Sequence, residues 1–121
     1  MDLSVIVPIF NEEENIRPLV EGIGAVLAPS SYDYEILLVD DGSHDNSFTL
    51  LKEMASRDRR VKVIRLRRNF GQTAAMAAGF NAAMGSIVIP MDGDLQNDPT
   101  DIGRLMEKVG EPAGSGPGGG E

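Results

Sequence analysis

The chain has 121 residues, 41% of them hydrophobic and 25% charged, which suits one globular domain with a buried core. Its formal net charge of -8 argues against general nucleic-acid binding, and the lack of cysteine excludes disulfides and thiolate zinc sites. No apolar stretch reaches the roughly 18 residues of a membrane-spanning helix, and the first residues lack the basic start of a signal peptide. The composition therefore predicts a cytoplasmic domain.

Short apolar runs of strand length alternate with helical patterns along the first 109 residues. Strands are expected at residues 3–10, 34–39, 61–66 and 86–91. Helices are expected around residues 16–27, 48–55 and 72–84, and again from Pro99 to about Val109. Asn11 and Glu14 have the spacing of a capping box before the first helix. This order predicts an α/β fold with an open, mostly parallel, doubly wound sheet.

The last twelve residues differ from the rest. Residues 110–121 are rich in glycine and proline and contain no apolar side chain larger than alanine. Such a composition cannot pack into a core and is typical of a flexible tail. We therefore expect an ordered part over residues 1–109 that is truncated on its C-terminal side.

Acidic residues follow two of the expected strands. Asp40 and Asp41 follow the second, and Asp92 and Asp94 follow the fourth. Two carboxylates separated by one residue point the same way along an extended chain, and Gly93 between them leaves room for a ligand. Open parallel sheets bind ligands beyond the carboxyl ends of their strands. The pair predicts a site for a hard divalent cation that also contacts substrate phosphates.

Simpler interpretations exist for several of these residues. The acidic residues after the second strand also suit a turn with a helix cap at Ser43 or Asp45, and Asp98 suits a cap before Pro99. The lone histidine, His44, is expected to be solvated. Seven of the eleven basic residues lie between Arg57 and Arg68, which fits a charged edge strand or a face for anionic lipid or phosphate.

Four segments of the sequence resemble glycosyltransferase family 2. They are residues 5–12 (VIVPIFNE), 39–43 (VDDGS), 68–71 (RNFG) and 91–99 (MDGDLQNDP). The last segment is similar to the polyprenyl-phosphate branch, which includes enzymes like dolichyl-phosphate mannosyltransferase. The resemblance covers about residues 3–109 and implies the nucleotide-sugar-binding part of a GT-A-type, Rossmann-like fold.

The resemblance also implies roles for individual residues. Pro8, Phe10 and Glu12 match the motif that lines the nucleoside pocket, and Asp41 matches the acid that reads the base. Asp92 and Asp94 match the catalytic, metal-binding pair, and Gln96 matches a glutamine of the metal shell. The residues expected to bind the nucleotide and its cation are Pro8, Phe10, Glu12, Val39, Asp41, Met91, Asp92 and Gly93.

The activity implied is transfer of a sugar from a UDP- or GDP-sugar to a polyprenyl phosphate or a related acceptor, assisted by Mg²⁺ or Mn²⁺. A lipid acceptor implies contact with the cytoplasmic face of a membrane. The acceptor-side segment of the family is absent from the sequence, so a non-catalytic, nucleotide-binding fragment is an alternative. A phosphoacceptor receiver domain is a weaker alternative. Such a domain needs its acid pair after the first strand, whereas here the acidic residues follow the second and fourth strands.

Overall fold

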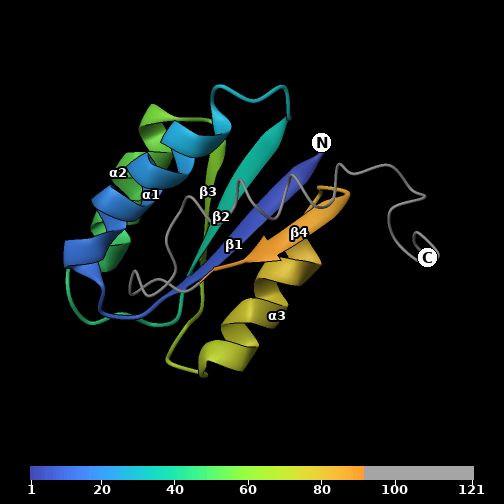
Figure 1. The fold of residues 1–121 in the computed structure, drawn as a ribbon. Helices are drawn as coiled ribbons and strands as arrows, with labels where there is room; N and C mark the ends of the chain where they lie inside the picture. Colours follow the sequence, from blue (N-terminus) through green and yellow to red (C-terminus); the bar gives the residue numbers. More distant parts are fainter. Residues whose placement is uncertain (92–121) are drawn as a thin grey trace.

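The computed structural model describes residues 1–91, which form a four-stranded parallel sheet with helices on both faces. The strands are β1 (Leu3–Ile9), β2 (Tyr34–Asp40), β3 (Val61–Arg65) and β4 (Ile87–Pro90), and the helices are α1 (Glu13–Leu27), α2 (Ser47–Arg57) and α3 (Gln72–Ala82). The order across the sheet is β3-β2-β1-β4 (Figure 1). The doubly wound α/β arrangement expected from the sequence is confirmed for these residues. The helix expected from Pro99 and the tail at 110–121 lie outside them.

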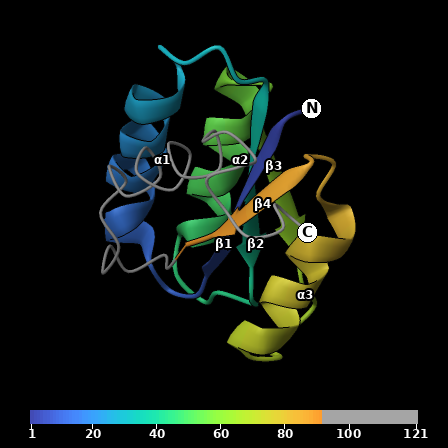
Figure 2. The ribbon, with the colours of Figure 1, turned by 45° about the vertical axis from the view of Figure 1, so that its right-hand side comes forward.

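The two faces of the sheet bury separate sets of apolar side chains. Alternate residues of β1, such as Val5 and Val7, pack under α1 and α2, whereas Ile6 packs with Val39 and Ala75 under α3. Figure 2 shows α1 and α2 together on one side of the sheet and α3 on the other. Both faces of β1 and β2 are covered, which explains why these strands are apolar without alternation.

Helix α3 lies very close to β1. A Cβ added at Gly79 would lie 2.3 Å from the Ile6 Cγ2 atom, so the absence of a side chain allows this approach. The alanine-rich sequence of α3 provides the same small surface around it, with Ala75 fully buried. Small residues at Ala75 and Gly79 therefore allow α3 to pack closely on the sheet.

A buried polar network joins the amino ends of β1, β2 and β4. Glu35 is 1% exposed, and its carboxylate accepts hydrogen bonds from Ser4 Oγ at 2.6 Å, Lys62 Nζ at 2.8 Å and the Met84 backbone N–H at 2.8 Å. Ser4 Oγ in turn accepts from the Gly85 N–H at 2.8 Å. Burial raises the pKa of Glu35, but the hydrogen bonds and the charge of Lys62 outweigh it and leave the pKa below 4.5.

This network predicts an acid-sensitive stability. A lowered pKa in the folded state adds stability above pH 4.5, which is lost as the pH falls through the folded-state pKa. At pH 7, Glu35→Gln is expected to reduce the free energy of unfolding by about 1.5–3 kcal/mol, the range for hydrogen bonds to a charged group. In the variant, this part of the acid dependence should disappear. Urea unfolding between pH 3 and pH 7 measures both effects.

Glu53→Gln is the matched control, because Glu53 bridges Arg17 and Arg57 at the surface. Exposed ion pairs contribute about 0–1 kcal/mol, so the control should unfold nearly as the parent chain does. Equal losses in the two variants would contradict a special role for Glu35.

The basic residues between Arg57 and Arg68 surround β3, at one end of the described sheet. Lys62 pairs with Glu35, Arg57 pairs with Glu53, and Arg60 lies over the Tyr34 ring at 4.9 Å. These contacts support the interpretation of a charged edge strand. In the described part of the chain, no helix has both the length and the apolar character needed to cross a bilayer.

Candidate functional site

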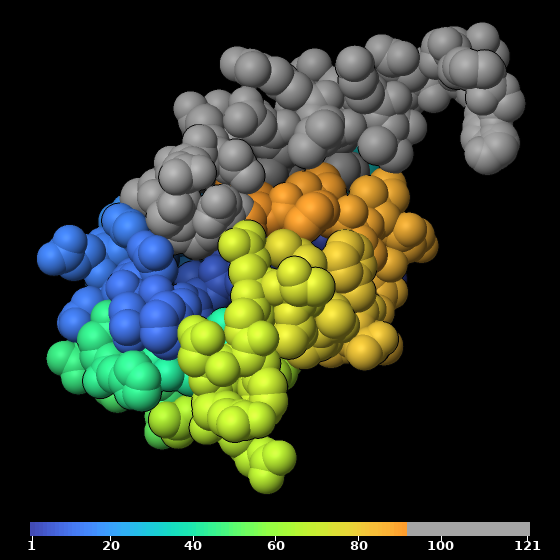
Figure 3. Space-filling view, turned by 90° about the horizontal axis from the view of Figure 1, so that it is seen from below, coloured from blue at the N-terminus to red at the C-terminus, as the bar shows by residue number. Residues whose placement is uncertain are grey.

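The carboxyl ends of the four strands meet at one edge of the sheet, because all four strands are parallel. Figure 3 shows the segments after β1 (blue), after β2 (green) and before α3 (yellow-green) side by side. Loops gathered at such an edge form the usual ligand site of an open α/β sheet. This is the edge at which the sequence places the acidic residues.

The loops after β1 and β2 are joined by reciprocal hydrogen bonds. Asn11 has a positive φ of 52°, and its Oδ1 accepts from the backbone N–H groups of His44 at 2.8 Å and Asp45 at 3.4 Å. In the other direction, the Asn11 N–H donates to Ser43 Oγ at 3.0 Å, and the Glu12 N–H donates to Ser47 Oγ at 3.0 Å. The two loops therefore hold one another in place.

The capping box expected at Asn11 and Glu14 is wrong. The residue before α1 is Glu12, which makes no side-chain capping bond, and the Asn11 amide binds the β2 loop instead. Asn11 can serve this loop because asparagine tolerates the left-handed conformation better than most residues do.

Asp45 stabilises the starts of two helices. Its carboxylate accepts from the Ser47 N–H at 2.9 Å and from the Glu13 N–H at 3.4 Å. Burial raises the pKa of Asp45, but hydrogen bonds, chiefly from Ser47, lower it overall. The residue before α2 is Asn46, which makes no side-chain capping bond, so neither Ser43 nor Asp45 is the N-cap that the sequence suggested. Asp45 instead accepts from the first residue of α2, and Ser43 accepts from the Asn11 N–H.

Asp41 joins the β2 loop to the segment before α3. Its side chain is 3% exposed, and its oxygens accept from the Phe70 N–H at 2.8 Å, the Gly71 N–H at 3.0 Å and Asn69 Nδ2 at 3.3 Å. Gly71 has a positive φ of 102°, a conformation that glycine adopts without steric cost. Asp41, which the family resemblance assigns to recognition of the nucleotide base, therefore holds the segment before α3 in place.

Gly42 brings the same two segments into backbone contact. Its φ is 75°, and a Cβ at this position would lie 2.4 Å from the Arg68 carbonyl carbon and 2.5 Å from the Asn69 nitrogen. Only glycine fits here without moving the backbone. Three loops that follow different strands are therefore fixed to one another before any ligand binds.

Asp40 is fully buried beside this junction. Its Oδ1 accepts from the Ser43 N–H at 3.3 Å, and the Arg65 Nε lies 3.8 Å from its Oδ2, which accepts no hydrogen bond within the described residues. Arg65 in turn lies over the Phe48 ring at 4.0 Å. Asp40 is the last residue of β2, and Asp41 follows it. Of these two side chains, only that of Asp41 accepts hydrogen bonds from the segment before α3.

The structure gathers the described candidates at this edge. Phe10 is 38% exposed at the end of β1, with its ring edge-on to His44 at 6.2 Å, and Glu12 is half-buried. His44 is exposed, as expected for a solvated histidine. The remaining described candidates are buried near the carboxyl ends of β1, β2 and β4: Pro8, Val39 and Met91.

The expected cation ligands lie outside the described residues. Asp92, Gly93, Asp94 and Gln96 follow Met91, whose N–H donates to the Ile6 carbonyl at 2.8 Å and continues the pairing of β4 with β1. Within residues 1–91 there is no group of three acidic or histidine side chains able to hold a metal.

The sequence did not reveal the hydrogen bonds that assemble the edge. Asn11, Ser43, Ser47 and Asn69 make contacts across 28 to 35 residues of chain. One available signal was the short polar residues after each strand, which favour turns and side-chain-to-backbone hydrogen bonds.

The sequence and the fold match known glycosyltransferases. Residues 4–117 match the model of glycosyl transferase family 2. The dodecaprenyl-phosphate galacturonate synthase of Rhizobium johnstonii is 44% identical over 110 residues, which are 90% of this chain and 32% of that protein. The chain spans about a third of the length of the curated relatives it matches.

Solved structures share the arrangement of the sheet. S. aureus TarS 1–349 in complex with UDP-GlcNAc matches with a TM-score of 0.71 and 25% identity, over 90% of this chain and 31% of that one. The mannosyltransferase PcManGT from Pyrobaculum calidifontis, in complex with GDP-Man and Mn²⁺, matches with a TM-score of 0.74 and 21% identity, over 92% of this chain and 33% of that one. These neighbours have the GT-A fold, and the chain belongs to glycosyl transferase family 2.

Proposed function

We propose that the protein to which this chain corresponds transfers a sugar from a nucleotide-diphosphate sugar to a polyprenyl phosphate. In this proposal, residues 1–109 form the nucleotide-sugar-binding part. The main structural support for this proposal is the junction around Asp41, where the loops after β1 and β2 meet the segment before α3 at the carboxyl edge of the sheet. A preassembled edge of this kind binds a nucleotide with little loss of conformational entropy. The likeness to the Rhizobium synthase supports the choice of acceptor class.

The nucleoside is proposed to bind beside the loops after β1 and β2. The exposed ring of Phe10 offers an apolar surface there, and Glu12 and Asp41 offer carboxylate acceptors. Two of the three donors to Asp41 bind one oxygen, and the third binds the other, which leaves acceptor capacity for a base N–H. Pro8, Val39, Met91 and Gly93 are proposed to complete the pocket.

Asp92, Asp94 and Gln96 are proposed to hold Mg²⁺ or Mn²⁺. Their oxygen donors have the chemistry that these cations prefer, and β4 ends immediately before them. When bound, the cation would neutralise the charge that develops on the departing diphosphate. The carboxylates would also orient the diphosphate, which contributes to the rate through positioning.

The acceptor proposal places the protein at the cytoplasmic face of a membrane. A lipid phosphate is ionised near neutral pH and can attack without a general base from this chain. Arg59 and Arg67 are exposed beside β3 and could contact anionic headgroups.

The test combines donor binding with sugar transfer by the 121-residue chain. UDP- and GDP-sugars with Mn²⁺ should bind, whereas added polyprenyl phosphate should give little glycolipid, because these 121 residues span about a third of the length of the relatives they match. Lack of binding to any nucleotide would overturn the proposed function. Rapid glycolipid formation would show instead that the acceptor site lies within this chain.

A further inference from the structure

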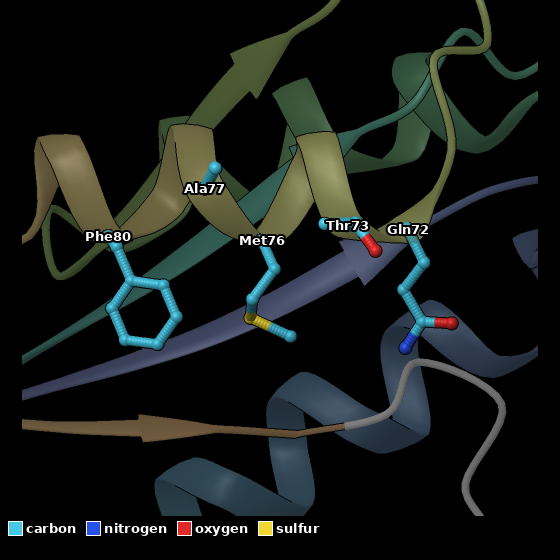
Figure 4. Close-up of a pocket in the computed structure, with 5 residues that line it drawn as sticks. All are labelled: Gln72, Thr73, Met76, Ala77 and Phe80. Carbon is cyan, nitrogen blue, oxygen red and sulfur yellow. The ribbon is translucent and has the colours of Figure 1, made fainter.

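The hollows on the surface of residues 1–91 differ in the charge of the residues that line them. One of about 470 Å³ lies beside α3, and the five residues that line it carry no charge: Gln72, Thr73, Met76, Ala77 and Phe80 (Figure 4). Another, of about 220 Å³, is lined chiefly by charged side chains, which are Arg59, Arg60, Lys62, Asp33 and Glu35, together with Tyr34. We call this second hollow the basic pocket.

The basic pocket lies at the amino ends of two neighbouring strands. Asp33 directly precedes β2, and Arg60 directly precedes β3, which runs parallel to β2. The candidate nucleotide site lies at the opposite, carboxyl edge of the sheet. The seven residues of β2 separate the two edges by about 20 Å. A ligand in the basic pocket would therefore occupy a site separate from the candidate nucleotide site.

The two acidic residues of the pocket already have cationic partners. The Glu35 carboxylate is buried and accepts from Lys62 Nζ at 2.8 Å, and Asp33 Oδ2 lies 3.6 Å from the amino group of Met1, which also lines the pocket. An ammonium group has three donors, and the Lys62 side chain is 43% exposed. Lys62 can therefore bind a further acceptor while it stays paired with Glu35.

The two arginines make no salt bridge within residues 1–91, yet Arg60 is held in place. Its guanidinium lies over the Tyr34 ring at 4.9 Å. Its backbone N–H donates to Asp58 Oδ1 at 2.9 Å, and its carbonyl accepts from the Ile36 N–H at 2.8 Å. A guanidinium that lies over a ring keeps its fork of N–H donors for an anion, and its order reduces the entropy lost on binding.

We propose that the basic pocket binds the phosphate group of a phosphomonoester, with Arg59, Arg60 and Lys62 as its donors. Such a group carries a charge of about −1.5 to −2 at pH 7, which matches the charges of the two arginines, and guanidinium groups bind phosphate oxygens in pairs. The pocket is several times larger than the roughly 30 Å³ share of one water molecule, so it has room for a phosphate and part of its ester group. Because the chain has a net charge of -8, this local positive charge distinguishes the pocket from most of the surface. This site is independent of the proposed sugar transfer.

Soluble esters and phosphatidic acid both present such a phosphate, so the test has one arm for each source. In the first arm, inorganic phosphate and glycerol 3-phosphate are titrated into the 121-residue chain at pH 7 and constant ionic strength, and proton–nitrogen NMR follows the backbone amides. Saturable shifts are expected in residues 33–36 and 58–62, whereas the amides of Asn11, Asp41 and Gly71 should not move. In the second arm, the chain is sedimented with phosphatidylcholine vesicles with and without phosphatidic acid. Binding in the first arm identifies a soluble ligand, and binding only to vesicles with phosphatidic acid identifies a lipid-borne phosphate.

Two double variants locate the binding. Arg59→Gln with Arg60→Gln should weaken it at least about tenfold, because hydrogen bonds between charged groups are lost. Arg17→Gln with Lys52→Gln removes the same charge from exposed positions of α1 and α2 and should leave the affinity within about twofold. Circular dichroism confirms that each variant is folded. Arg59→Gln alone, which removes no hydrogen bond or ion pair within residues 1–91, should also weaken binding. Absence of binding in both arms, shifts at the carboxyl edge instead of the pocket, or equal losses in the two double variants would overturn the proposal.

Discussion

Gly42→Ala should be the most damaging single-methyl change in residues 1–91. The left-handed conformation at φ 75° costs a non-glycine residue about 1–2 kcal/mol. The new methyl would also meet the Arg68 carbonyl carbon at 2.4 Å, and overpacking of this kind adds about 1–3 kcal/mol. We expect the free energy of unfolding to fall by about 3 kcal/mol in total, measured by urea denaturation at pH 7.

Gly24→Ala is the matched control. Gly24 lies inside α1, and a Cβ there would have no atom within 4 Å. Alanine in a helix interior is favoured over glycine by about 0.5–1 kcal/mol, so this variant should be slightly more stable than the parent chain. A Gly42→Ala variant as stable as Gly24→Ala would show that the β2 loop and the segment before α3 are not tightly packed.

Asp41→Ala is expected to weaken nucleotide binding and stability together. The variant leaves three donors without their acceptor: the N–H groups of Phe70 and Gly71 and the side chain of Asn69. Losing a hydrogen bond to a charged group costs about 1.5–3 kcal/mol, which for the proposed bond to the base corresponds to roughly 10- to 150-fold in affinity. Calorimetric titration with UDP and GDP, at a temperature where the variant is folded, measures the binding effect.

Asn69→Ala separates the structural role of Asp41 from its proposed role in base recognition. It removes one donor from the carboxylate at 3.3 Å but leaves the carboxylate itself in place. We expect a small loss of stability and nearly unchanged nucleotide affinity. If Asp41→Ala instead unfolds more easily but binds as tightly as the parent chain, Asp41 is a turn residue without a role in base recognition.

The sequence predicted every described element because local patterns determine them. Buried parallel strands are short apolar runs, and α1 shows helical spacing from Ile16 to Leu27. The ends of the helices and strands were less predictable. The sequence predicted that α3 reaches Met84, but the helix ends at Ala82. The N–H of Met84 instead donates to Glu35, which is 49 residues away in the chain.

The candidate site was also predictable only where local sequence patterns determine it. The position of Asp41 after β2 was predictable from the apolar run that precedes it. Its partners were not, because Phe70 and Gly71 are 29 and 30 residues away in the chain. Asn11 was wrongly expected to cap α1 for the same reason: a local pattern cannot show that the β2 loop offers the donors of His44 and Asp45.

The proposed function requires a nucleotide site whose cation is held by the residues after β4. Its most direct test is calorimetric titration of UDP and GDP into the parent chain and into an Asp92→Asn, Asp94→Asn double variant, each with Mn²⁺ and with excess chelator. Asp98→Asn is the control, because asparagine caps a helix as well as aspartate does. We expect chelator to lower the affinity of the parent and control chains at least tenfold (~1.4 kcal/mol), and the double variant to bind weakly with or without Mn²⁺. Equal affinity of the parent chain with Mn²⁺ and with chelator would contradict it.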